Sequence, residues 1–131
     1  MGFGPIVPTL KVASMQASLS FYVDVLGFSV KWSWSSEAQF DESDSAEFAC
    51  LECGEAVLFL SSNSGGAESS LFVELPFVED VDALAEKLQG IVTLGETPAD
   101  KLWGLREFSL ADPDGHSLRM SCPLDRTCRQ A

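Results

Sequence analysis

The sequence predicts an α+β fold of two βαβββ modules that form one curved mixed sheet, with a concave cleft inside and helices on the outer face. Three observations predict it. Apolar residues gather in short segments of strand length, two amphipathic stretches have helical spacing, and the order strand, helix, three strands occurs twice. The 131 residues suit a single domain, 1–131, with module one at about 5–62, a linker at about 62–70 and module two at about 71–123.

The first module begins with a strand expected at 6–12, where Pro5 and Pro8 suit an irregular entry or a sheet edge. A helix follows, because apolar residues recur at helical spacing from Met15 to Leu26. Ser14 is placed to cap its start, and Gly27 to end it. Strands are then expected at 28–34, 47–52 and 56–62; the polar, acidic segment 35–45 is expected to be a loop.

The second module repeats this order after a Ser- and Gly-rich connector at 61–70. A strand is expected at 71–77, then a helix capped by Asp80 and closed by Gly90. A short strand is expected around 91–94. The last two strands, 105–111 and 116–122, flank Asp-Pro-Asp-Gly at 112–115, which is typical of a turn.

The charge of the chain limits its partners. A net charge of −12 disfavours nucleic acid and anionic membranes, which would be repelled, and is compatible with a cationic ligand. The same charge could serve only to keep the protein soluble. No stretch approaches the ~20 apolar residues of a membrane span, and the N-terminus lacks the features of a signal peptide, so a cytoplasmic location is expected.

The four cysteines do not form a convincing metal motif. Cys50 and Cys53 have the spacing of a zinc knuckle, but Cys122 and Cys128 lie too far apart for a second tight pair. We therefore expect reduced structural thiols. The single histidine, His116, lies in the last turn and is expected at the surface.

Aromatic residues on the expected strands and nearby loops suggest a binding surface. Planar ligands stack on such rings, and a cation can lie over an indole face for ~0.5–2 kcal/mol. Any one of these rings could instead belong to the core. The set comprises Trp32, Trp34, Phe40, Phe48, Phe59, Trp103 and Phe108.

Several segments of the chain resemble the vicinal oxygen chelate superfamily, which includes glyoxalases, bleomycin resistance proteins and dioxygenases. The opening of module one carries the resemblance at 9–12 and 18–28, and the end of module two carries it at 103–115. The latter, Trp-Gly-Leu-Arg-Glu-Phe-Ser-Leu-Ala-Asp-Pro-Asp-Gly, is similar to the bleomycin resistance branch.

Enzymes of this superfamily hold a divalent ion on His and Glu side chains. The resemblance places those ligand positions at residues that cannot coordinate a metal, so neither a metal nor another cofactor is expected. They are Val7, Phe59, Val73 and Arg119.

The resemblance also implies a homodimer that sequesters a cationic, planar antibiotic of the bleomycin type in clefts at the subunit interface. Tryptophan at position 32 departs from the smaller aromatic usual there. The ligand-binding residues expected from the residue pattern and the resemblance together are Trp32, Trp34, Phe40, Phe48, Phe59, Ser61, Trp103, Gly104 and Glu107.

Two other functional classes stay open. A metal-free or atypical enzyme acting on a small metabolite would require a perturbed carboxylate among Glu52, Glu74 and Glu107. An interaction module without a small ligand would fill the cleft with its own side chains.

Overall fold

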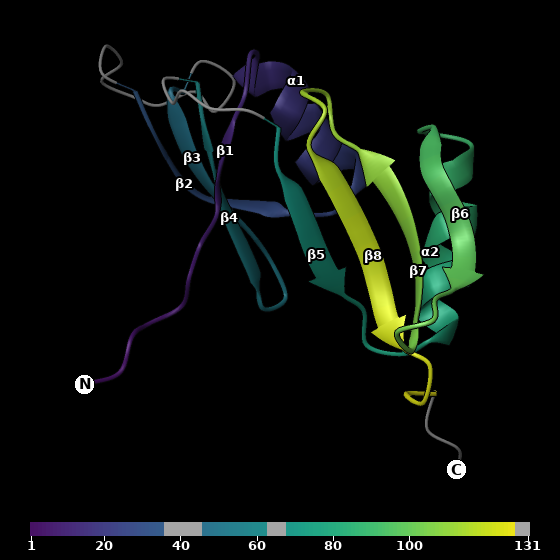
Figure 1. Cartoon of the computed structure of the whole chain (residues 1–131). Coiled ribbons are helices and arrows are strands. Elements are labelled where there is room, and N and C mark those ends of the chain that lie inside the picture. Colours follow the sequence, from purple (N-terminus) through teal and green to yellow (C-terminus); the bar gives the residue numbers. More distant parts are fainter. Residues whose placement is uncertain (36–45, 63–67, 128–131) are drawn as a thin grey trace. The chain divides into compact units, whose positions relative to one another are not determined.

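The computed structural model describes residues 1–35, 46–62 and 68–127, and it divides into two compact units, 1–68 and 69–131 (Figure 1). Each unit contains one four-stranded mixed sheet with a helical segment, and each follows the order strand, helix, three strands. The predicted α+β class and its two repeated modules are confirmed. The common cleft between the modules stays a prediction.

Unit one contains a sheet of four strands in the order β1-β4-β3-β2. The strands are β1 (Thr9–Lys11), β2 (Ser29–Trp34), β3 (Phe48–Cys53) and β4 (Ala56–Ser61). β1 runs parallel to β4, and the other pairs are antiparallel. β1 is shorter at its start than expected, because Pro8 cannot donate to a ladder. Pairing starts from the carbonyl of Pro8, which accepts a hydrogen bond from the Phe59 amide at 2.9 Å.

The first helical segment changes its winding halfway. It consists of α1 (Met15–Leu19), followed without a break by the π-helix η1 (Ser20–Val25). The Ser14 cap is confirmed, since its Oγ accepts from the Ala17 amide at 3.1 Å. Gly27 follows the segment with φ +90°, a conformation that glycine adopts without steric cost. Met15, Leu19, Phe21 and Tyr22 are buried, as the spacing predicts, whereas Leu26 at the end of the predicted stripe is only partly buried.

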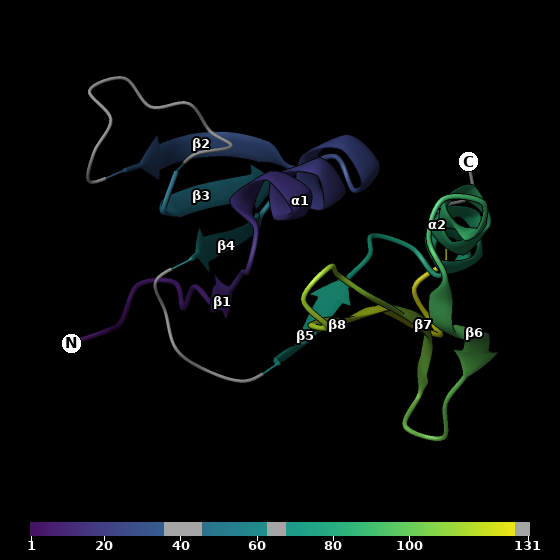
Figure 2. The same cartoon turned by 90° about the horizontal axis from the view of Figure 1, so that it is seen from above.

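Unit two contains a sheet in the order β5-β8-β7-β6 and the helix α2 (Glu79–Gln89), which packs against β6, β7 and β8. The strands are β5 (Ser70–Glu74), β6 (Leu94–Asp100), β7 (Leu105–Ala111) and β8 (Ser117–Pro123). Figure 2 shows α2 along one face of this sheet. Val81, Ala85 and Leu88 are its buried residues. Leu84, expected on this stripe, is only partly buried, and Ala85 takes the buried place.

Two details of unit two differ from the sequence prediction. The strand expected around 91–94 runs instead from Leu94 to Asp100, and Ile91 lies exposed in the turn after the helix. The pairing of β6 with β7 is interrupted between Glu96 and Ala99, where Pro98 cannot donate to the ladder. Asp80 is not the N-cap of α2, because the helix already begins at Glu79; the Asp80 carboxylate accepts from the Phe77 amide at 3.0 Å.

The turn predicted at 112–115 is confirmed in detail. The Asp112 carboxylate accepts from the amides of Asp114 and His116, each at 2.9 Å, and Gly115 has φ +86°. His116 is not at the surface as expected. It is 2 % exposed, and its Nδ1 accepts from the Ser69 amide at 2.9 Å. None of the helices in the described ranges is long and apolar enough to cross a membrane.

Candidate functional site

The sheet of unit one has one apolar, buried face and one open face. Side chains alternate along each strand, and opposed residues of neighbouring strands share a face. The buried face carries Leu10, Ala49, Leu51, Leu58 and Leu60, each at most 4 % exposed. The open face holds two cross-strand rows, which are Trp32, Cys50 and Phe59, and Trp34, Phe48 and Ser61. Five of the nine predicted ligand residues therefore lie on this one face.

Three rings on the open face touch one another and form what we call the aromatic cluster: Trp32, Phe48 and Phe59. Trp32 and Phe48 stack nearly parallel, with ring centroids 5.7 Å apart and an interplanar angle of 11°. Phe59 is tilted by about 50° against both, at 5.7 and 5.2 Å. These distances lie in the range in which aromatic pairs attract. Cys50 belongs to the same row but is buried, so the rings form the accessible surface.

A pocket of about 370 Å³ lies beside the aromatic cluster. Trp32 and Trp34 contribute to its wall while staying 45 % and 54 % exposed, so a ligand could cover both rings. The lining residues also include an acidic one, Glu47. An indole next to a carboxylate favours a cation, and the flat rings favour a planar group. The residues that line the pocket are Trp32, Ser33, Trp34, Glu47, Phe48 and Ser61.

Sequence reasoning did not place Ser33 and Glu47 among the ligand-binding residues. The sequence predicts Glu47 as the first residue of the strand expected at 47–52. It comes directly before β3, and its amide donates to the Trp34 carbonyl at 2.8 Å, which brings it next to the end of β2. An acidic residue directly before a strand that begins with an aromatic residue is the sequence signal that could have identified Glu47. Phe40 lies outside the described residues.

Three further predicted residues, Trp103, Gly104 and Glu107, belong to unit two. Trp103 is 62 % exposed in the turn between β6 and β7, with the Lys101 ammonium 5.9 Å from its ring centroid. The turn is closed by hydrogen bonds between Lys101 and Leu105 and between Gly104 and Lys101, at 2.7 and 3.0 Å. Trp103 is thus an accessible ring, already contacted by a cation of the chain.

Gly104 has a structural role in this turn, because its φ is +90°. We expect Gly104→Ala to lower the free energy of unfolding by about 1–2 kcal/mol, since the added Cβ disfavours this conformation. Chemical denaturation would measure the loss. Gly90→Ala is the matched control: Gly90 has φ −85°, and nothing lies within 4 Å of an added Cβ. An equal loss in both variants would contradict the prediction.

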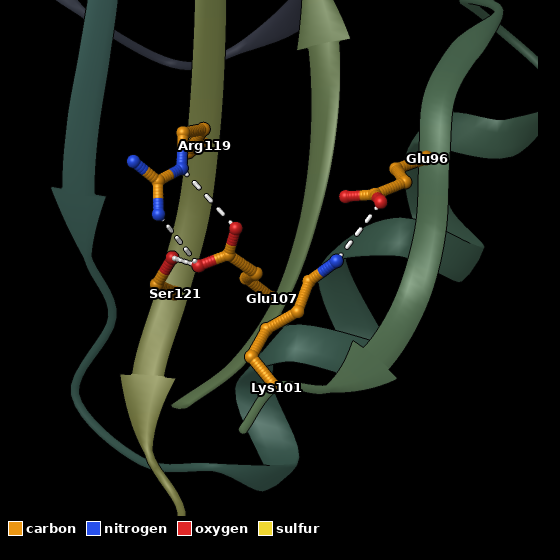
Figure 3. Close-up of polar contacts among 5 residues, drawn as sticks. All are labelled: Glu96, Lys101, Glu107, Arg119 and Ser121. Atoms are coloured by element: carbon orange, nitrogen blue, oxygen red, sulfur yellow. Dashed lines mark hydrogen bonds and ion pairs between the residues drawn. The ribbon is translucent and has the colours of Figure 1, made fainter. Parts of the chain in front are cut away.

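Glu107 lies on the face of its sheet opposite α2 and is 4 % exposed. Figure 3 shows its carboxylate accepting two hydrogen bonds from Arg119, at Nε and Nη2, and one from the Ser121 hydroxyl, each 3.1 Å long. Burial alone would raise the pKa of Glu107, but these hydrogen bonds and the charge of Arg119 outweigh it, and the pKa is lowered. The carboxylate is therefore held ionised and is a weak proton acceptor.

The neighbouring residue Arg106 points to the other face, as alternation along a strand predicts. Its guanidinium pairs with Asp82 of α2 at 2.9 Å and with Asp100 of β6 at 2.7 Å. The side chains of Arg106 and Glu107 therefore lie on opposite faces of the sheet. Arg106 ties the helix to the strands, and Glu107 belongs to the open face.

The positions that the resemblance assigned to metal ligands fall in different environments. Phe59 belongs to the aromatic cluster and Arg119 to the ion pair with Glu107. Val7 precedes β1, and Val73 pairs with the buried Met120, so it faces α2 rather than the open side. Within the described residues, no three His, Cys, Asp or Glu side chains are grouped so that they could hold a metal ion.

Phe108, an aromatic residue considered for binding, is a core residue. It is fully buried and pairs with Met120 on the face covered by α2. Of the carboxylates considered for catalysis, Glu52 forms a long ion pair with Lys31 at 4.0 Å, and Glu74 pairs with Arg126. Each strand carboxylate therefore already faces a cation of the chain.

The comparisons with known proteins agree with this architecture. The solved structure of a glyoxalase/bleomycin resistance protein/dioxygenase from Nocardioides superposes with a TM-score of 0.69 at 19% identity, covering 100% of this chain and 92% of that one. TioX from Micromonospora sp. ML1 gives 0.72 at 20% identity, with 92% and 100% covered. A lactoylglutathione lyase from Agrobacterium tumefaciens gives 0.72 at 14% identity, with 93% and 96% covered.

At these low identities, the TM-scores show a shared fold. No curated protein matches the sequence. The model of the Glyoxalase/Bleomycin resistance protein/Dioxygenase superfamily matches residues 4–120, which is most of the chain. The chain therefore belongs to the glyoxalase/bleomycin resistance protein/dioxygenase superfamily.

Proposed function

We propose that this protein binds and sequesters a small cationic or planar aromatic molecule, without using a metal and as a homodimer. A bleomycin-type antibiotic is the best single candidate for the ligand, and drug resistance by sequestration is the corresponding role. The observation that carries the proposal is the aromatic cluster beside a pocket of about 370 Å³, with Glu47 among the residues that line it. This combination places a stacking surface next to an acidic residue.

Electrostatics supports a cationic ligand over an anionic one. The chain carries 20 acidic and 8 basic residues, which gives −12 at neutral pH. Such an excess attracts cations over a distance, and the attraction weakens as salt shortens the Debye length. Binding should therefore be tighter at low ionic strength.

Sequestration is preferred over catalysis because of the state of Glu107. A metal-free enzyme would need a carboxylate poised to take up a proton, with its pKa raised toward neutrality. Glu107 is shifted in the opposite direction by Arg119 and Ser121. The lactoylglutathione lyase shares the fold at 14% identity, which is too distant to transfer an activity.

Calorimetric titration with metal-free bleomycin tests the proposal. We expect submicromolar binding near one ligand per chain, weakened when the salt concentration is raised and unchanged after treatment with a chelator. The absence of heat and of binding would contradict the proposal of a bleomycin-type ligand, and planar cationic metabolites would then be screened. A requirement for added metal would contradict the metal-independent mechanism.

Trp32→Ala should weaken ligand binding by about 1–3 kcal/mol, because it removes one half of the stacked pair with Phe48. The same titration measures the change, and the circular dichroism spectrum serves as a control for folding. Trp103→Ala is the comparison, since Trp103 is also an exposed tryptophan but belongs to unit two. Unchanged affinity in the Trp32 variant would mean that the stacking surface lies elsewhere; a loss in both would assign the turn of unit two to the site as well.

A further inference from the structure

We propose that Arg119 anchors a second binding site, on the open face of unit two, for a small organic carboxylate whose apolar part contacts Phe72. This site is independent of the aromatic cluster and of the proposed sequestration. It rests on three features of the described residues: how the guanidinium is held, what lies beneath it and how the surrounding charges balance.

The guanidinium of Arg119 is held in place by one edge only. Its Nε and Nη2 donate to the two carboxylate oxygens of Glu107, and the Ser121 hydroxyl donates to the same carboxylate. Glu107 and Ser121 are 4 % and 0 % exposed, so the support is rigid and removed from water. An arginine fixed in this way loses little further side-chain entropy when it binds a ligand.

The other edge of the guanidinium is available. An arginine has five N–H donors, and Glu107 engages two of them. Nη1 makes no hydrogen bond within the part of the chain that the structure describes, and Figure 3 shows it pointing away from Glu107. The Nη1 and Nη2 edge has the geometry that binds a carboxylate through two parallel hydrogen bonds. The Arg119 side chain is 38 % exposed, so a ligand can reach it.

Phe72 provides an apolar surface next to this edge. Phe72 and Arg119 are paired residues of β5 and β8, and the guanidinium carbon lies 5.8 Å from the ring centroid. The ring is 50 % exposed although it lies within a strand. An organic acid could therefore place its carboxylate on Arg119 and its apolar part against Phe72.

The local charges favour a monoanion. The pairs Arg119–Glu107 and Lys101–Glu96 make the neighbourhood neutral, within a chain that is strongly acidic elsewhere (Figure 3). Glu107 and Glu96 would repel a multiply charged phosphate more strongly than a carboxylate, which carries a single negative charge. The proposal is thus an organic carboxylate rather than a phosphate.

The test is an NMR titration of the ¹⁵N-labelled full chain with benzoate, acetate and inorganic phosphate, followed at the Arg119 Nε–H and the backbone amides of Phe72 and Ser109. We expect saturable shifts with benzoate at millimolar concentration, and binding to benzoate about fivefold tighter than to acetate, because only benzoate covers Phe72. Phosphate should shift these signals least.

Two variants and a control separate the site from general effects of charge. Arg119→Lys should weaken benzoate binding roughly tenfold, because an ammonium cannot form the two-bond contact. Phe72→Leu should lower the preference for benzoate over acetate, because leucine keeps an apolar surface but loses the contact between two rings. A purely structural role of Phe72 would not alter this ratio. Arg126→Lys, which alters the exposed pair with Glu74 near the same sheet, should leave binding unchanged.

Several outcomes would overturn the proposal. These are the absence of saturable shifts with benzoate, equal weakening in the Arg126 variant, an unchanged benzoate-to-acetate ratio in Phe72→Leu, and tighter binding of phosphate than of benzoate. If Arg119→Lys perturbs the spectrum of the folded protein, the ratio of benzoate to acetate affinity in Phe72→Leu still tests the proposal. Because the bleomycin titration addresses the aromatic cluster, either proposal can fail without the other.

Discussion

Replacing Phe108 with alanine is expected to lower the free energy of unfolding by about 3–5 kcal/mol, the usual cost of removing a buried aromatic ring. Phe108 is fully buried on β7, pairs with Met120 and lies on the face of the sheet that α2 covers. The neighbouring strands and the helix cannot close fully over the space that the ring leaves. Urea denaturation followed by far-ultraviolet circular dichroism would measure the change.

Phe72→Ala is the matched control for this prediction. Phe72 is the same residue type in the same sheet, but it lies on the open face and is 50 % exposed. Its replacement should cost far less, because little apolar area leaves the protein interior. Comparable losses in the two variants would show that the assignment of the two faces is incorrect.

These two phenylalanines also show what the sequence could and could not predict. The order of elements was predictable, because helical spacing, strand-length apolar segments and the turn at 112–115 are local signals. Which face of a strand is covered depends on register and on the position of α2. Phe59 and Phe108 therefore look alike in sequence, although one lies on an open face and the other in the core.

The errors within the fold have local causes. Pro98, which follows the strand expected around 91–94, concealed the strand from Leu94 to Asp100, because a proline is tolerated there only by an irregularity in the pairing. His116 was expected at the surface because the sequence places it in the last turn. It is buried because its ring accepts a hydrogen bond from the Ser69 amide, a partner 47 residues away that no local pattern reveals.

The candidate site was predictable in part for the same reasons. Trp32, Phe48 and Phe59 were identified as strand aromatics, and the register of β2, β3 and β4 brings them together. The partnership of Glu107 with Arg119 was not foreseen. The two residues lie 12 positions apart, and their contact depends on the register that the hairpin sets between β7 and β8.

The ion pair between Glu107 and Arg119 leads to the second prediction, a large loss of stability. Glu107→Ala is expected to lower the free energy of unfolding near neutral pH by about 2–3 kcal/mol, because it leaves the buried Ser121 hydroxyl and the Arg119 guanidinium without their acceptor. Glu74→Ala is the matched control. Glu74 also lies on the open face of this sheet and pairs with an arginine, but its side chain is 50 % exposed, so its loss should have little effect.

The pH dependence of this difference identifies the ion pair as its cause. The pKa of Glu107 is lower in the folded protein than in the unfolded chain, so its contribution is fully present above the unfolded value of about 4.3. The contribution is lost as the pH falls through the folded pKa, where the carboxylate takes up a proton. Denaturation curves from neutral pH down into this range should therefore show the wild-type protein and Glu107→Ala converging in acid. A gap that stays constant with pH would mean that Glu107 stabilises the fold through packing alone, since the loss of van der Waals contacts does not depend on protonation.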